Sequence, residues 1–204
     1  MADRYRDFAS LAKEQFEGTD YRITSAFRPS RVAVIAPHGG FIEPGTSELA
    51  AAVAGANHSF YAFEGLLPNR KHSDLHITST KFDEPVGCNL VASADVVVAM
   101  HGRADGVDAE ATWLGGRDAD LLVKLEGYLR DAGFLSLIAS GALGGLSKYN
   151  ICNRGARGAG AQLELPRTLR DDLASDSQRM ASFAEPIRVA IEKHLHSLAE
   201  QGEL

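Results

Sequence analysis

The order of apolar and polar positions along the chain follows two periods, one typical of helices and one typical of buried strands. Residues 3–16 carry apolar side chains at helical spacing up to Gly18 and predict an amphipathic helix. The runs VAVIAP (32–37) and DVVVAM (95–100) are almost wholly apolar. Strands that are covered on both faces have this composition. Both runs therefore predict interior strands of one sheet, with their carboxyl ends side by side.

The rest of the chain continues to alternate between strand and helix patterns. Further strands are expected at YRITSAF (21–27), SFYAFEG (59–65), LHITST (75–80), FLSLIAS (134–140) and AQLELP (161–166), with ATWLGG (111–116) as an irregular or strand segment. Helices are expected at about 46–54, 118–131 and 177–198, and another follows Asp83 as N-cap, with Pro85 in its first turn. This alternation predicts an α/β fold: a single three-layer α/β/α domain over residues 1–204 with a mixed, mostly parallel sheet.

Composition and charge exclude several classes of protein. Of the 204 residues, 45% are hydrophobic and 24% charged, as in an ordinary globular domain. The longest apolar runs are far shorter than the roughly 20 residues of a membrane span. The first residues are charged and lack the apolar core of a secretory signal, so a cytoplasmic protein without a membrane partner is expected. A net charge of −6 argues against a nucleic-acid partner.

The two cysteines give no sign of a disulfide framework or of a metal-binding pair. Cys88 and Cys152 lie far apart in the sequence, and neither belongs to a C-x-x-C motif. We interpret both as reduced thiols, in keeping with the expected compartment.

The candidate chemistry lies where apolar strands end, because α/β sheets bind ligands beyond the carboxyl ends of their strands. His38 follows the first interior strand, with Glu43 five residues later, and His101 follows the second. Two histidines and a carboxylate are the ligand types of a catalytic zinc site. Alternatives remain open: either histidine is a hydrogen-bonded loop residue, or Glu43 stabilises a helix N-terminus.

Other polar residues are candidates with competing interpretations. Glu164 interrupts the apolar strand AQLELP, so it is either functional or faces solvent from an edge strand. His76 is either a substrate-binding group or a buried histidine bonded to a backbone carbonyl. The remaining histidines are expected in loops or on the surface of the last helix: His58, His72, His194 and His196.

Several longer motifs point to a known family. These are PHGGFIEPGTSEL (37–49), FEGLLP (63–68), LHITSTKFDEP (75–85) and NRGARGAGAQLEL (153–165), together with the HG pair after the valine-rich strand. In order and spacing they resemble the phage-type poly-γ-glutamate hydrolases, compact relatives of the zinc carboxypeptidases. The resemblance covers about residues 32–167.

The resemblance implies a zinc carboxypeptidase-like fold and one zinc cofactor. It makes His38, Glu43 and His101 the metal ligands and Glu164 the catalytic carboxylate. His38 and Glu43 are five residues apart, whereas the larger carboxypeptidases use a tighter H-x-x-E. Glu48 is therefore an alternative third ligand.

The activity that the resemblance implies is hydrolysis of γ-glutamyl amide bonds in poly-γ-glutamate. Because each unit of that polymer carries a carboxylate, Arg154 and Arg157 are expected to bind substrate. The same metal chemistry suits a zinc deacylase or carboxypeptidase acting on small N-acyl amino acids or peptides. A non-catalytic binding protein is a third possibility, against which the retention of Glu164 argues. If the chain is phage-derived, release by cell lysis is expected.

Overall fold

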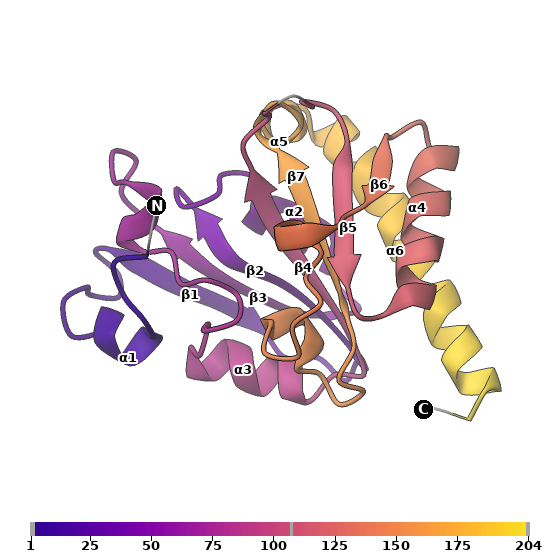
Figure 1. The fold of residues 1–204 in the computed structure, drawn as a ribbon, viewed down its shortest axis with the longest axis horizontal. Helices are drawn as coiled ribbons and strands as arrows, with labels where there is room; N and C mark the ends of the chain where they lie inside the picture. The colour runs from indigo at the N-terminus through magenta and orange to yellow at the C-terminus, as the bar shows by residue number, and fades with distance from the viewer. Residues whose placement is uncertain (1–2, 107, 203–204) are drawn as a thin grey trace.

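A seven-stranded sheet runs through the centre of the computed structural model, which describes residues 3–106 and 108–202 (Figure 1). In chain order the strands are β1 (Tyr21–Ala26), β2 (Val32–Gly40), β3 (Ser59–Gly65), β4 (Val96–Arg103), β5 (Thr112–Gly116), β6 (Ser136–Ile138) and β7 (Ala161–Pro166). Their order across the sheet is β1-β3-β2-β4-β7-β5-β6. The β1/β3 and β5/β7 pairs are antiparallel, and the other four pairs are parallel. The predicted mixed, mostly parallel sheet is confirmed.

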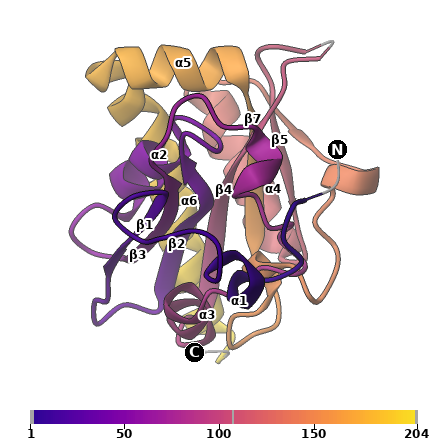
Figure 2. The ribbon, with the colours of Figure 1, turned by 90° about the vertical axis from the view of Figure 1, so that its left-hand side faces the viewer.

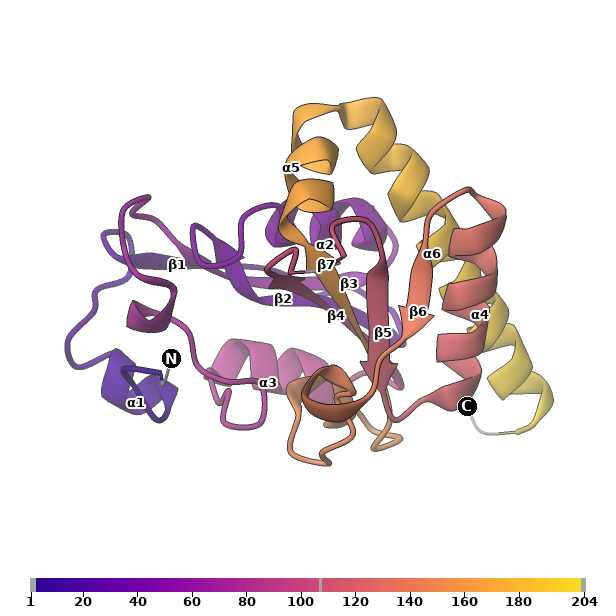
Figure 3. The same cartoon turned by 45° about the horizontal axis from the view of Figure 1, so that its top comes forward.

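Helices cover both faces of the sheet, which gives the three layers expected. One face is covered by α2 (Thr46–Ala54), α4 (Ala119–Asp131), α5 (Arg167–Ser175) and α6 (Ser177–Glu200), and the other by α1 (Phe8–Leu11) and α3 (Pro85–Ala92). Figure 3 shows α1 and α3 on one side of the strands and α2, α5 and α6 on the other. Short 3-10 turns lie at His72–Asp74, Gly141–Leu143 and Ile151–Asn153.

The interior strands β2 and β4 lie next to each other, as their apolar sequences predict. Val32 pairs with Val96 and Ile35 with Ala99 in a parallel ladder. Successive side chains of these strands enter opposite cores, because a strand has a period of two. Parallel pairing brings the carboxyl ends of both strands to one edge of the sheet, where α5 also lies (Figure 2).

The predicted helix at residues 3–16 is wrong beyond one turn. Only Phe8–Leu11 is helical, with Asp7 as its N-cap. The Gln15 side chain donates to the Tyr5 hydroxyl at 2.7 Å, whereas a continuous helix would hold these residues about 15 Å apart. The segment therefore folds back on itself and buries Tyr5 and Leu11 against the sheet.

Two further differences concern residues 75–85. LHITST is not a strand, because its backbone bonds to side chains in place of a neighbouring strand: the Ile77 carbonyl accepts from His38 and the Thr78 N–H donates to Asp3. The N-cap of α3 is Glu84, whose carboxylate accepts two N–H groups of the first turn. Asp83 accepts from the Phe8 N–H instead.

Helix α5 directly after β7 did not follow from the sequence pattern, which predicted only the helix that became α6. Its nine residues bury Leu169, Arg170 and Leu173 and expose a highly charged face.

Both cysteines are free thiols, and burial raises the pKa of Cys152 to about 12. None of the helices in the described ranges is long and apolar enough to span a membrane.

Candidate metal centre

A cleft of about 360 Å³ opens at the carboxyl ends of β2, β4 and β7. The four residues that the sequence assigns to the metal and to catalysis all line it. Its other polar lining residues are His72, His76, Thr78, Ser79, Thr80, Arg103, Asn150 and Gln162. The site thus occupies the position at which α/β sheets bind their ligands.

A β-bulge in β2 turns His38 toward this cleft. The register against β3 passes from Ala36 opposite Ala62 to Gly39 opposite Glu64, so β2 carries one extra residue. The bulge contains Pro37, which cannot donate to a ladder and is tolerated in an interior strand at such a position. Even-numbered residues before the bulge face the α2/α6 core, but His38 lies on the opposite face, beside Ile77.

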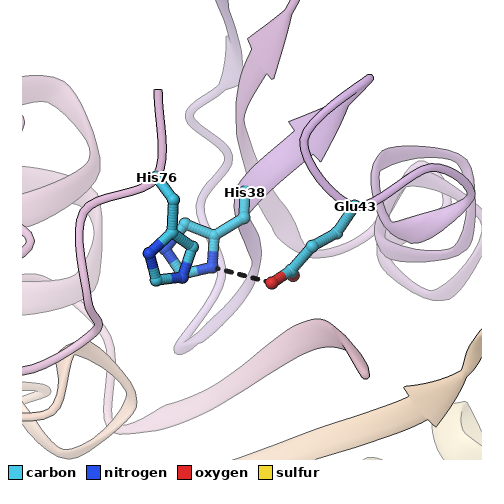
Figure 4. Close-up of side chains that lie close together, drawn as sticks. All are labelled: His38, Glu43 and His76. Atoms are coloured by element: carbon cyan, nitrogen blue, oxygen red, sulfur yellow. Dashed lines mark ion pairs between the residues drawn. The ribbon is translucent and has the colours of Figure 1, made fainter. Parts of the chain in front are cut away.

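Three side chains from two segments converge in the cleft. The Nδ1 atoms of His38 and His101 are 3.2 Å apart. Glu43 reaches between them, with Oε1 3.5 Å from His38 Nδ1 and Oε2 3.7 Å from His101 Nδ1. Figure 4 shows the Glu43 carboxylate pointing at His38 from the loop after β2. All three residues are buried.

This arrangement fits a zinc ion. With bonds of about 2.0–2.1 Å, tetrahedral zinc separates its ligand atoms by roughly 3.3–3.5 Å, close to the spacings of the three side chains. His38 Nε2 lies 2.8 Å from the Ile77 carbonyl, which can only accept, so Nε2 carries the hydrogen and the neutral ring keeps a lone pair on Nδ1. Such an outer hydrogen bond fixes the tautomer of a metal-binding histidine.

The other two candidate ligands also have hydrogen-bond partners. His101 Nε2 is 3.3 Å from the Ser79 hydroxyl, and Glu43 Oε2 accepts from the Gly102 N–H at 2.8 Å. Burial opposes ionisation of Glu43, but the facing His38 and His101 hold the pKa of that carboxyl well below its usual range. Glu48 is exposed on α2, which leaves Glu43 as the carboxylate at this position.

His76 is a further imidazole beside His38, and its nitrogen also comes within 4.8 Å of the His38 and Glu43 ligand atoms. Its ring lies over that of His38, with centroids 4.0 Å apart and planes inclined by 36° (Figure 4). His76 Nδ1 is bonded to Asp3 at 2.6 Å, which leaves Nε2 available to a cation. His101 Nδ1 lies 3.2 Å from His38 Nδ1, a spacing that one zinc ion can bridge. We therefore take His101 as the partner of His38 and keep His76 as the alternative.

The environment of His76 disfavours its charged form. Burial is the main cause that lowers the pKa of His76, to about 3, and the charge of the neighbouring His38 is the second cause. A neutral His76 has its hydrogen on Nδ1, facing the Asp3 carboxylate, and presents a hydrogen-bond acceptor at Nε2.

Glu164 lies in the interior of the sheet rather than on an edge, so the solvent-facing interpretation is wrong. Strand β7 lies between β4 and β5, and Glu164 pairs in register with His101. Its Oε1 accepts from Gln162 Nε2 at 2.9 Å, while Gln162 Oε1 accepts from Asn150. Burial is the larger cause that raises the pKa of Glu164 above its usual range, and the negative charge of Glu43 adds to it.

Arg154 and Arg157 do not line the cleft. They precede β7, and since β7 is parallel to β4 its start lies at the opposite end of the sheet from His101. Arg154 donates to the Phe82 carbonyl near α3. Arg157 donates to Asp118 at 2.7 Å and lies 3.4 Å from His194. We expected these arginines to bind substrate because they come shortly before Glu164 in the sequence. That short distance along the chain does not bring them to the cleft in the fold.

Several cleft residues were not identified from the sequence, among them Gln162, Asn150 and Arg103. Gln162 carried a usable signal, because residues two apart in a strand share a face and Gln162 is two before Glu164. Asn150 and Arg103 carried none. Conversely, His194 is buried on α6, contrary to its expected surface position, and His58 lies in the expected loop but is also buried.

The chain has relatives among known proteins. Residues 5–186 match the family model described as poly-gamma-glutamate hydrolase. The chain is 39% identical over 175 residues to the SPbeta prophage-derived UPF0714 protein YoqZ of Bacillus subtilis (strain 168), covering 84% of this chain and 62% of that relative. It therefore spans somewhat less than two thirds of that protein.

Two solved structures share the fold along their whole length. One is a bacteriophage poly-gamma-glutamate hydrolase, with a TM-score of 0.89, 30% identity and coverage of 96% of this chain and 99% of the other. The second is described as a zinc-free apo form of YndL, with a TM-score of 0.86, 31% identity and coverage of 93% and 98%.

Proposed function

Because this chain belongs to the poly-γ-glutamate hydrolase family, we propose that it hydrolyses γ-glutamyl amide bonds of poly-γ-glutamate with a zinc ion bound by His38, Glu43 and His101. The observation that carries the proposal is the convergence of two imidazole Nδ1 atoms and one carboxylate, 3.2–3.7 Å apart, in a cleft. Three protein ligands leave the fourth zinc position open, as catalysis requires.

Glu164 is the general base in this proposal. Bound zinc supplies Lewis acidity and makes water nucleophilic at neutral pH. Glu164 Oε1 is occupied by Gln162, and in the described ranges no group donates to Oε2. Oε2 therefore takes the proton of the attacking water and delivers it to the nitrogen of the leaving amine. Its raised pKa suits both transfers, because a general base works best when its pKa approaches the working pH.

A second cavity continues the cleft and supports a polymeric substrate. It measures about 410 Å³ and shares Glu43, His72, Gly102 and Arg103 with the first. Its far wall contains Arg167 and Arg170 of α5. A polymer that crosses both cavities would pass the metal ligands and then this wall. Arg170 is buried there, so Arg167, exposed and at the rim, is our candidate for carboxylate binding in place of Arg154 and Arg157.

The deciding experiment measures metal content and polymer length together. We expect about one zinc per chain and shortening of poly-γ-glutamate that chelator abolishes and added zinc restores. A chain that binds zinc and hydrolyses small N-acyl amino acids but leaves the polymer intact would support the deacylase alternative. Zinc binding without hydrolysis of either substrate would support a binding protein.

A further inference from the structure

The side chain of Arg170 links three separate segments beneath the cleft. Arg170 lies on α5 and is 5% exposed. Its Nε donates to the Leu165 carbonyl at 3.2 Å, one Nη to the Pro44 carbonyl at 2.5 Å, and the other Nη to the Arg103 carbonyl at 3.3 Å.

Each of those carbonyls belongs to a residue one or two positions after a residue of the proposed site. Pro44 follows the ligand Glu43, Leu165 follows the base Glu164, and Arg103 lies two residues after the ligand His101. A planar guanidinium holds its N–H groups in a rigid fork, so three bonds from one side chain fix the relative positions of the three backbone segments.

Two glycines make room for this arrangement. A Cβ on Gly102 would lie 2.5 Å from Cζ of Arg170, so any side chain there would displace the guanidinium. Gly45 has φ +91° and packs on the backbone and Cβ of Arg170. The Gly102 N–H also donates to Glu43, so the backbone that orients this ligand rests directly on Arg170.

A proline ends β7 at this point. Pro166 pairs with Arg103 of β4 and has no N–H to donate to a neighbouring strand. Arg170, four residues later in the first turns of α5, supplies donors to the carbonyls of both strands.

We propose that Arg170 is a positioning residue that sets the geometry of the metal centre by holding the segments of Glu43, His101 and Glu164 in register. This rests on the proposed zinc site. It does not require the proposed substrate, because its main measurement is metal affinity.

The test compares Arg170→Lys and Arg170→Met with Arg188→Met. Arg188 is a suitable control because it donates to the Ala52 carbonyl from α6, away from the cleft. Zinc dissociation constants come from competition with a chromophoric chelator. Visible spectra of the cobalt-loaded proteins report coordination geometry. Outer-shell partners of metal ligands typically contribute about 10–100-fold to metal affinity or activity.

We expect both Arg170 variants to bind zinc about 10–100-fold more weakly than the parent. We also expect altered cobalt spectra and a lower kcat at saturating zinc with KM little changed. Arg188→Met should match the parent in all of these. A purely structural Arg170 would lower the unfolding temperature of the metal-free protein without moving the cobalt spectrum or the zinc-saturated kcat, and that result would overturn the proposal.

A further variant covers the case in which Arg170→Met does not fold. Arg170→Ala leaves space for a small cation, and methylguanidinium should restore zinc affinity to this variant more effectively than methylammonium does. Equal effects of the two cations, together with parent-like zinc binding by Arg170→Lys, would contradict a role for the guanidinium fork. If the parent binds zinc but leaves γ-glutamyl substrates intact, the proposed function fails while these metal measurements still decide the role of Arg170.

Discussion

Two buried clusters in this protein contain histidine and carboxylate side chains, yet their atoms face one another differently. In the cleft, His38 and His101 direct Nδ1 atoms at each other across 3.2 Å with Glu43 alongside. On the other side of the sheet, Asp118 caps α4 through the Leu121 N–H and accepts from His194 at 2.9 Å and from Arg157 at 2.7 Å.

We interpret this difference as separating the proposed cation site from a cluster that stabilises the fold. The Asp118 carboxylate is surrounded by donors that compensate its charge. Burial alone would raise the pKa of Asp118, but the hydrogen bonds from His194 and Arg157 outweigh burial and lower that pKa to about 2. In the cleft, the two Nδ1 atoms and the Glu43 carboxylate face one another instead, and in our proposal a cation joins them. The direction of donors and acceptors, more than burial or residue type, therefore distinguishes the two clusters.

Removing a ligand from the cleft should have the largest effect. His101→Ala or His38→Ala leaves two ligand side chains, so we expect loss of bound zinc and of chelator-sensitive hydrolysis. Metal analysis of the purified proteins checks this, with the exposed His196→Ala as control. Stoichiometric zinc in both cleft variants would show that the convergence is not the metal site.

Replacing the proposed base should separate catalysis from metal binding. Glu164→Gln keeps the shape and the Gln162 contact but cannot accept a proton, so kcat should fall by about 10²–10⁴-fold. Zinc content and KM should change little, because the carboxylate acts mainly in the transition state.

The matched control for this experiment is Glu48→Gln, which removes an exposed carboxylate of α2 and should leave kcat unchanged. Parent-like turnover by Glu164→Gln would make Glu164 a structural strand residue. His76 would then be the next residue to test.

The contrast between the clusters also shows what the sequence could predict. The apolar runs of β2 and β4 identify interior strands, and parallel strands bring His38 and His101 to one edge. The bulge at Pro37, which puts His38 on the correct face, cannot be inferred from a period of two. Arg157 was misplaced because its distance from Glu164 in sequence ignores the direction of β7. Arg170 depends on carbonyls up to 126 residues away, for which no local pattern exists.

The Asp118 cluster should affect stability and leave the metal site unchanged. Asp118→Asn preserves a good N-cap but removes the charge that faces His194 and Arg157. Breaking a buried ion pair costs about 3–5 kcal/mol, so we expect a loss of about 3 kcal/mol in unfolding free energy at pH 7, with zinc content and kcat unchanged. Urea denaturation measures the loss, and Asp120→Asn, exposed in the same helical turn, is the control.

The same cluster predicts a pH dependence with a definite sign. The folded-state pKa of Asp118 is lowered to about 2, from about 3.9 in an unfolded chain, so its contribution is complete above about pH 4 and is lost as the pH falls toward 2. The difference in unfolding free energy between parent and Asp118→Asn should therefore be constant from pH 7 to 5 and shrink near pH 3. A difference that persists unchanged at pH 3 would mean that the charge of Asp118 does not cause it.

The smallest expected effect concerns substrate charge at the rim of the cleft. Arg167 is half exposed and pairs with Asp171 in the next turn of α5, a contact that contributes little to stability. Arg167→Gln should therefore leave folding, zinc content and kcat unchanged.

If Arg167 binds substrate carboxylates, KM for poly-γ-glutamate should rise by about three- to fivefold at low salt, the size expected for one exposed charge pair. The rise should diminish at 0.5 M salt, where screening shortens the range of such interactions. Arg130→Gln removes an exposed arginine of α4 that is likewise paired with an aspartate, and serves as control. Equal KM values for the two variants at low salt would place the carboxylate contacts elsewhere in the cleft.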